Sequence, residues 1–228
     1  MIVLVTGGSG MVGKNFLEIC NSTAMNIIAP TRSEMDLFNY NSTYNYILEN
    51  KPDIIIHLAA RVGGISANIT SPVEFLIDNF DINRNLILAA KNANVKKILN
   101  IGSSCMYPVN AMNPLTEDIL MSGKLEPTNE GYALSKIFSL KLCNMISKNN
   151  PSFIYKTIIP CNLFGKYDNF NENTSHLLPA IIEKTHMAIM NRKKHITIWG
   201  DGHSRREFLY VYDFVDFLLN AINIFDDL

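Results

Sequence analysis

Apolar and polar positions follow one another along the chain in a pattern that predicts strands and helices in turn. Short apolar runs, typical of strands buried on both faces, occupy 2–6, 26–29, 53–58, 97–102 and 154–159. Apolar residues recur at helical spacing over 11–20, 75–92, 132–147, 177–191 and 213–224. A further short strand is expected at 196–199. Alternating strands and helices predict an α/β fold with a doubly wound parallel sheet and right-handed crossovers.

The pattern divides the chain into two parts. Residues 1–160 are expected to form a Rossmann-type dinucleotide-binding domain that carries the catalytic residues. Residues 161–228 are expected to supply a small, incomplete substrate-binding region interleaved with the last elements of the sheet. The sequence stops directly after a helix, where a doubly wound fold normally continues into another strand, so we expect more chain at this end.

A glycine-rich turn joins the first strand to the first helix. It contains glycines at spacings of three in the stretch TGGSGMVG at 6–13. Glycines allow a tight turn and a close approach of the backbone to a pyrophosphate, while the helix N-terminus offers free N–H groups. A purely structural turn is the alternative. The context predicts a dinucleotide bound by Gly7, Gly10, Met11, Val12 and Gly13.

The end of the second strand indicates which dinucleotide is bound. An NAD site favours an acidic residue there, whereas this chain has APTRS at 29–33. The Arg32 guanidinium is suited to a 2′-phosphate, which favours NADP(H). A solvated arginine is the alternative, and Glu34 and Asp36 weaken the prediction if the strand ends later. At the end of the third strand, small or apolar residues suit a cofactor that crosses the strand ends: Leu58, Ala59 and Ala60.

Three polar residues form a candidate catalytic group. Ser103 ends the fourth strand, at the edge where doubly wound sheets bind ligands. Tyr132 and Lys136 are four residues apart and therefore share one helix face. An ammonium beside a phenol is expected to lower the pKa of Tyr132, so that it can protonate a developing alkoxide while Ser103 holds the same oxygen. With hydride from a nicotinamide, this chemistry reduces a carbonyl.

Composition excludes several other classes of protein. The chain has 228 residues, 47% of them hydrophobic and 18% charged, which is enough apolar material for one sizeable core. Its net charge of -1 provides no basic field for nucleic acid or an anionic membrane. We find neither a membrane span nor a signal peptide. The four cysteines lie far apart without metal-ligand spacing, so we expect free thiols, no metal and a cytoplasmic location.

Several unusual strings make the chain resemble a known family. It is similar to the extended short-chain dehydrogenase/reductases, and among them to the epimerase-reductases that make GDP-L-fucose from GDP-4-keto-6-deoxy-D-mannose. The strings are RVGGI at 61–65, GSSCMYP at 102–108, LEPTNEGY at 125–132, NLFG at 162–165, DNF at 168–170, SHLLPA at 175–180 and REFLYV at 206–211. They span nearly the whole chain in the family's order.

The resemblance implies a role for each matching residue. Ser103, Tyr132 and Lys136 match the reductase triad, and Cys105 and His176 match the family's epimerisation pair. Carbons 3 and 5 of the sugar flank the C4 ketone, so a thiolate can remove their protons and a histidine can return them to the opposite face. Three residues match positions that contact the GDP-sugar: Asn162, Trp199 and Arg206. The family also implies a homodimer built from the helices at 75–92 and 132–147.

Three functions remain open at this point. The first is the epimerase-reductase of GDP-4-keto-6-deoxy-D-mannose. The second is a related reductase of another GDP-4-keto sugar, from a deoxy-heptose or colitose pathway. The third is a truncated, non-catalytic protein that binds NADP or a nucleotide sugar, against which the complete set of Ser103, Tyr132 and Lys136 argues.

Overall fold

The molecule is organised around a parallel sheet. The computed structural model describes residues 1–21, 25–171, 174–198, 200–203, 205–226 and 228. Five strands pair in the order β2-β1-β3-β4-β5, all parallel. They are β1 (Ile2–Thr6), β2 (Asn26–Ile28), β3 (Ile54–His57), β4 (Lys97–Ile101) and β5 (Ile154–Ile158). Strand β2 therefore lies on one side of β1, and β3, β4 and β5 lie on the other. This arrangement confirms the predicted doubly wound α/β fold.

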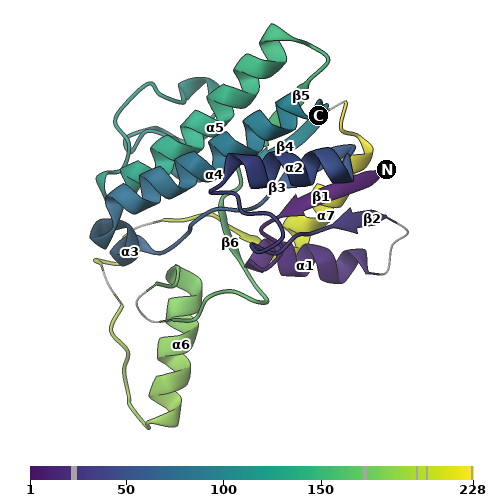
Figure 1. Cartoon of the computed structure of the whole chain (residues 1–228). Coiled ribbons are helices and arrows are strands. Elements are labelled where there is room, and N and C mark those ends of the chain that lie inside the picture. Colours follow the sequence, from purple (N-terminus) through teal and green to yellow (C-terminus); the bar gives the residue numbers. More distant parts are fainter. Residues whose placement is uncertain (22–24, 172–173, 199, 204, 227) are drawn as a thin grey trace.

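Helices cover both faces of this sheet (Figure 1). On one face, α1 (Met11–Cys20) and α7 (Val211–Asn223) pack with Val3, Val5 and Leu99. On the other face lie α2 (Tyr40–Asn50), α4 (Pro72–Asn92) and α5 (Glu130–Asn149), which cover Leu4 and Ile98. Successive strand residues therefore enter opposite cores, which explains why the strands read as continuous apolar runs.

Two elements differ from the sequence prediction. The strand expected at 196–199 is wrong, because 196–198 is not a strand and Trp199 lies outside the described residues. A second, two-stranded parallel sheet instead pairs β6 (Asn162–Phe164) with β7 (Phe208–Tyr210). Helix α2 was not anticipated, because its polar sequence hides the apolar stripe; it is capped by the side chain of Asn39, which accepts a hydrogen bond from the Ser42 N–H.

Shorter elements and one projecting helix complete the chain. A short helix, α3 (Ile65–Thr70), precedes α4, and 3₁₀ turns occur at Ser104–Met106, Glu117–Ile119 and Pro127–Asn129. Helix α6 (Leu177–Met190) extends away from the sheet as an arm (Figure 1). Most of its apolar side chains are exposed. None of the helices in the described ranges has the length and apolar character that crossing a membrane requires.

Candidate active site

The glycine turn between β1 and α1 forms a close-packed cradle. Gly7 has a φ of +71°, and a Cβ there would lie 2.7 Å from the backbone nitrogen of Ala59. A Cβ on Gly13 would lie 2.2 Å from the carbonyl oxygen of Gly7, and the N–H of Gly10 donates to that same oxygen. Only glycine fits at positions 7 and 13. The backbone of the turn is therefore open to the close approach of a pyrophosphate at the helix N-terminus. Met11 and Val12, half-buried, begin the helix and pack against the core.

A buried polar chain fixes the end of β3 beside this cradle. Thr6 Oγ1 lies 2.8 Å from His57 Nδ1 and accepts from the N–H of Ala59. The other ring nitrogen of His57 lies 3.0 Å from Asn83 Oδ1. Burial lowers the pKa of His57 to about 3, so the ring is neutral. The network holds Leu58, Ala59 and Ala60 at the carboxyl edge of the sheet. The sequence analysis missed this network, although a histidine in a buried apolar strand could have indicated it.

Arg32 lies in the loop after β2 and is exposed. Its Nε lies 3.6 Å from Asp36 Oδ1, and its guanidinium carbon lies 4.8 Å from the centre of the Phe38 ring. Glu34 turns its carboxylate back to accept from the N–H and the hydroxyl of Thr31. Because β2 ends early, at Ile28, no acidic residue stands directly after the strand.

Tyr132 and Lys136 lie in the first turns of α5, against the end of β4. Lys136 is 3% exposed, and its Nζ donates to the carbonyl oxygen of Ile101 at 2.7 Å and lies 5.8 Å from the centre of the Tyr132 ring. Burial lowers the pKa of Lys136 to about 8. The expectation of a lowered Tyr132 pKa is wrong for this structure, because burial of the phenol and the nearby Cys105 both raise it. The Lys136 ammonium donates instead to the carbonyl oxygen of Ile101.

Ser103 and Cys105 follow β4 and join the same group. The N–H of Cys105 donates to Ser103 Oγ at 3.5 Å, and burial raises the pKa of the Cys105 thiol against the opposing effects of Ser103 and Lys136. The intervening turn is anchored by Met106, which is fully buried against Ala133 and Ile137 of α5. The structure thus brings together four of the five predicted catalytic residues: Ser103, Cys105, Tyr132 and Lys136.

His176 lies on a different element from the other four residues. It is exposed and stands directly before α6, outside the sheet, and its side chain makes no capping hydrogen bond to the helix. The preceding segment is tied to the loop after β3: the N–H of Gly64 donates to the carbonyl oxygen of Thr174, and a Cβ on Gly64 would lie 2.5 Å from that of Ser175. Within the described residues, neither a hydrogen bond nor an ion pair joins His176 to Cys105.

Two of the residues expected to bind substrate, Asn162 and Arg206, lie in or just before the strands of the second sheet. Asn162 is exposed on β6 and donates from its side chain to the carbonyl oxygen of Glu207. The guanidinium of Arg206 is exposed and donates to the carbonyl oxygen of Arg205. Trp199 lies outside the described residues. The sheet of β6 and β7 and the α6 arm form the outer part of the molecule.

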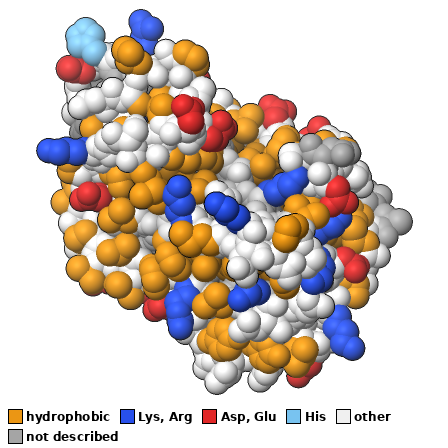
Figure 2. All heavy atoms as spheres, turned by 90° about the horizontal axis from the view of Figure 1, so that it is seen from above, with side chains coloured by type: hydrophobic (Ala, Val, Ile, Leu, Met, Phe, Trp, Pro, Cys, Tyr) orange, Lys and Arg blue, Asp and Glu red, His pale blue; other side chains and the backbone are white. Residues whose placement is uncertain are grey.

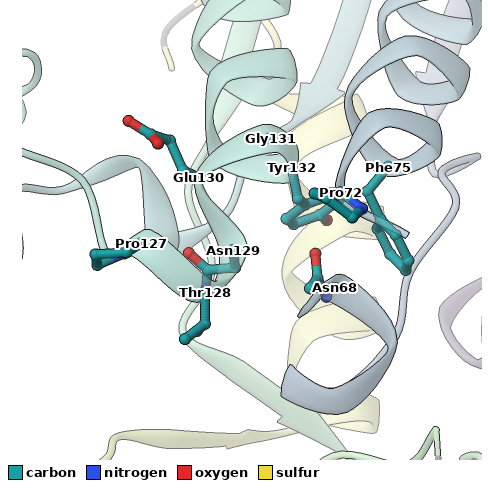
Figure 3. A pocket seen from close by; sticks show the side chains of 9 residues that line it. All are labelled: Asn68, Pro72, Phe75, Pro127, Thr128, Asn129, Glu130, Gly131 and Tyr132. Carbon is teal, nitrogen blue, oxygen red and sulfur yellow. The ribbon is translucent and has the colours of Figure 1, made fainter. Parts of the chain in front are cut away.

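A small pocket opens beside Tyr132 (Figure 3). Its volume is about 100 Å³, and its wall includes Asn68 of α3, Phe75 of α4 and Asn129 just before α5. The side-chain oxygens of Asn68 and Asn129 are both buried and accept no hydrogen bond from any described residue. Sequence reasoning missed both asparagines, although each lies in or beside a string that carries the family resemblance.

A comparison with protein families decides where the chain belongs. The model of the NAD dependent epimerase/dehydratase family matches residues 3–227. The chain belongs to this family. The resemblance expected from the sequence strings is thereby confirmed.

Known members of the family resemble the chain over almost its whole length. It is 51% identical to a GDP-L-colitose synthase from Yersinia pseudotuberculosis, over 99% of this chain and 73% of that protein. It is 45% identical to a GDP-L-fucose synthase from Azorhizobium caulinodans, over 97% of this chain and 71% of that protein. A GDP-L-fucose synthetase from Naegleria fowleri bound to NADP superposes with a TM-score of 0.86 at 31% identity, covering 97% of this chain and 72% of that one.

Proposed function

We propose that this chain is an NADPH-dependent enzyme that epimerises GDP-4-keto-6-deoxy-D-mannose at C3 and C5 and then reduces its C4 ketone to give GDP-L-fucose. The observation that carries the proposal is the group at the carboxyl end of β4, in which Lys136 is buried and Ser103, Cys105 and Tyr132 are half-buried. A protein that only binds a nucleotide has no use for this group, which argues against a non-catalytic binder.

NADP(H) is the cofactor that the residues fit best, in agreement with the NADP bound to the Naegleria fowleri relative. The cradle of Gly7, Gly10 and Gly13 with Met11 and Val12 would hold the pyrophosphate. Arg32 would contact the 2′-phosphate, and the segment Leu58, Ala59 and Ala60 would lie along the cofactor with Lys136. When bound, the cofactor supplies a hydride for C4 of the sugar.

For reduction, Tyr132 is the proton donor to the C4 oxygen. The phenol of Tyr132 is protonated at neutral pH, and it can transfer its proton as negative charge develops on the C4 oxygen. Ser103 donates a second hydrogen bond to the same oxygen, which stabilises the charge that develops there. Lys136, held by the Ile101 carbonyl, supplies a positive charge beneath the phenol.

For epimerisation, Cys105 is the base and His176 the acid. Cys105 lies beside Ser103, and therefore beside the ketone oxygen that Ser103 holds. A thiolate there removes the proton from a carbon next to the ketone, and the electrons move onto the C4 oxygen as an enolate. His176 would return a proton to the other face. Asn162, Trp199 and Arg206 would contact the GDP-sugar.

A related reductase is the second candidate. The 51% identity to a GDP-L-colitose synthase favours a 3-deoxy sugar as the alternative substrate, and a GDP-linked deoxy-heptose is a further one. Both use the same reduction step and differ in the carbons that Cys105 and His176 act upon.

The assembly and the division of the chain are also part of the proposal. We propose a homodimer formed by α4 and α5, in the cytoplasm. Apolar side chains are prominent on the face of the molecule shown in Figure 2. Both helices expose large apolar residues, which are Val73 and Ile77 on α4 and Leu134 and Met145 on α5. Residues 1–160 would hold the cofactor and most catalytic residues, and 161–228 part of the substrate region, although α7 from the second part packs on the sheet.

The proposal is tested by NADPH absorbance with a panel of GDP-4-keto sugars. We expect NADPH to be consumed with GDP-4-keto-6-deoxy-D-mannose and GDP-L-fucose to appear as product. Consumption with only a 3-deoxy sugar or a heptose would move the assignment to the second candidate. Binding of NADPH without turnover of any sugar would contradict the enzymatic function.

A further inference from the structure

The side chain of Asn68 is locked in one orientation. Its amide nitrogen donates to the carbonyl oxygens of Gly63 at 2.9 Å and Gly64 at 3.1 Å. If the amide were turned over, its oxygen would face both carbonyl oxygens and repel them. Asn68 is 5% exposed, so its nitrogen faces the backbone and its oxygen is directed the other way.

The oxygen of Asn68 is an unused acceptor in the pocket beside Tyr132. Figure 3 shows it pointing from α3 toward the side chain of Tyr132. It accepts no hydrogen bond from any described residue, and the oxygen of Asn129 on the same wall also has none. A buried carbonyl oxygen without a donor is costly, because nothing replaces the hydrogen bonds that it makes in water. The pocket therefore offers an acceptor to a hydrogen-bond donor that the described chain does not supply.

The chemistry next to Tyr132 restricts what this donor can be. This step rests on the proposed function, in which Tyr132 protonates the C4 oxygen of the sugar. Only C3 and C5 adjoin C4. C5 carries the methyl carbon and the ring oxygen, neither of which donates a hydrogen bond. The hydroxyl on C3 is the donor adjacent to the ketone.

We propose that Asn68 accepts a hydrogen bond from the C3 hydroxyl of the substrate and thereby selects 3-hydroxy over 3-deoxy 4-keto sugars. Asn68 is then a specificity-determining residue of the reductase site. A 3-deoxy sugar would bury the Asn68 oxygen against a methylene group and leave it unpaired. The assignment separates the two candidate substrates.

The test compares two sugars on the unaltered protein and on Asn68→Leu. One sugar is GDP-4-keto-6-deoxy-D-mannose and the other its 3-deoxy counterpart, both assayed by NADPH consumption. We expect the unaltered protein to favour the 3-hydroxy sugar by about 10- to 100-fold in kcat/KM. In Asn68→Leu the preference should fall to within about 3-fold, because kcat/KM drops for the 3-hydroxy sugar and not for the 3-deoxy sugar.

Two controls accompany this comparison. Asn45→Leu, at an exposed asparagine in the middle of α2, should keep the full preference. NADPH binding by Asn68→Leu reports whether the variant is folded. Asn68→Ala, which also removes the acceptor but adds no bulk, is assayed beside it, and the preference is measured on each variant that binds NADPH.

Equal kcat/KM for the two sugars in the unaltered protein would overturn the inference while the proposed function stands. The same holds if folded Asn68→Leu keeps the full preference. Turnover of neither sugar would instead contradict the proposed function, and this inference with it.

Discussion

The site is assembled from an inner and an outer region that are held in very different ways. In the inner region, Lys136 is fixed by a hydrogen bond to β4, and Met106 and Ala133 are buried in the same cluster. In the outer region, His176 is exposed at the start of α6 and is tied to the sheet domain through the Gly64 to Thr174 hydrogen bond. The inner region carries the residues proposed for reduction and Cys105, and the outer region carries His176, the proposed epimerisation acid.

If the proposed roles hold, this difference separates the two reactions physically. The residues proposed for reduction are positioned by the same contacts that form the core, so they are already in place in the folded chain. The position of His176 depends on a few contacts of an exposed segment, which are easier to disturb without unfolding the protein. Reduction and epimerisation should therefore respond differently to changes in the two regions.

The largest expected effect comes from Tyr132→Phe in the inner region. The change removes the proton donor and keeps the ring, so NADPH consumption with the keto sugar should fall by about 10²–10⁴-fold while NADPH still binds. Tyr44→Phe on α2 is the matched control. Turnover close to normal in Tyr132→Phe would remove this residue from its assigned role.

Cys105→Ser should separate the two reactions within the inner region. Serine keeps the size of the side chain but is a far poorer base than a thiol. Exchange of the C3 and C5 protons with deuterated water should fall by about 10²-fold or more, while slow reduction of the unepimerised ketone continues. Cys161→Ser is the control. Isotope exchange at the normal rate in Cys105→Ser would mean that Cys105 is a structural residue and not the base.

Gly64→Ala should disturb the outer region more strongly than the cofactor site. Its new methyl group would lie 2.5 Å from the carbonyl oxygen of Ser175 and push the segment before His176 away. A displacement of about 1 Å can cost about 10²-fold in rate, so isotope exchange should fall far more than NADPH binding. In the control Gly123→Ala, where the new methyl group meets only the side chain of Pro108, isotope exchange and NADPH binding should both stay normal. Equal losses of exchange and cofactor binding in Gly64→Ala would argue against separate regions.

Arg32→Ala should change cofactor preference without affecting either catalytic region. Loss of a charge-assisted contact to the 2′-phosphate should weaken NADPH by about 10- to 150-fold and leave NADH little changed. Fluorescence titration with both cofactors measures this. An equal loss for the two would mean that Arg32 does not contact the 2′-phosphate.

The smallest effect concerns stability and the burial of Lys136. Its folded pKa of about 8 lies below the ordinary value of 10.5, so between these pH values the unfolded chain binds more protons than the folded one. The free energy of unfolding should therefore rise with pH in this window, by at most about 3 kcal/mol more than in Lys136→Met. Urea unfolding at several pH values measures the difference. Parallel pH profiles for the two proteins would mean that Lys136 is not desolvated.

The inner region was largely predictable from the sequence, and the outer region was not. The continuous apolar runs predicted the sheet, and the spacing of Tyr132 and Lys136 predicted their common face, because both patterns follow from regular backbone geometry. The pKa of Tyr132 was predicted with the wrong sign, since burial depends on tertiary packing. The pairing of β6 with β7, 46 residues apart at Asn162 and Phe208, and the pocket at Asn68 arise from contacts between distant segments that no local pattern encodes.

The central claim is that one chain both epimerises and reduces a GDP-4-keto sugar. It is tested most directly by incubating the protein with GDP-4-keto-6-deoxy-D-mannose and NADPH in deuterated water and analysing the product by NMR and mass spectrometry. The account predicts GDP-L-fucose that carries solvent deuterium at C3 and C5 and a hydrogen from NADPH at C4. A reduced product that keeps the original configuration and carries no solvent deuterium at C3 or C5 would contradict it.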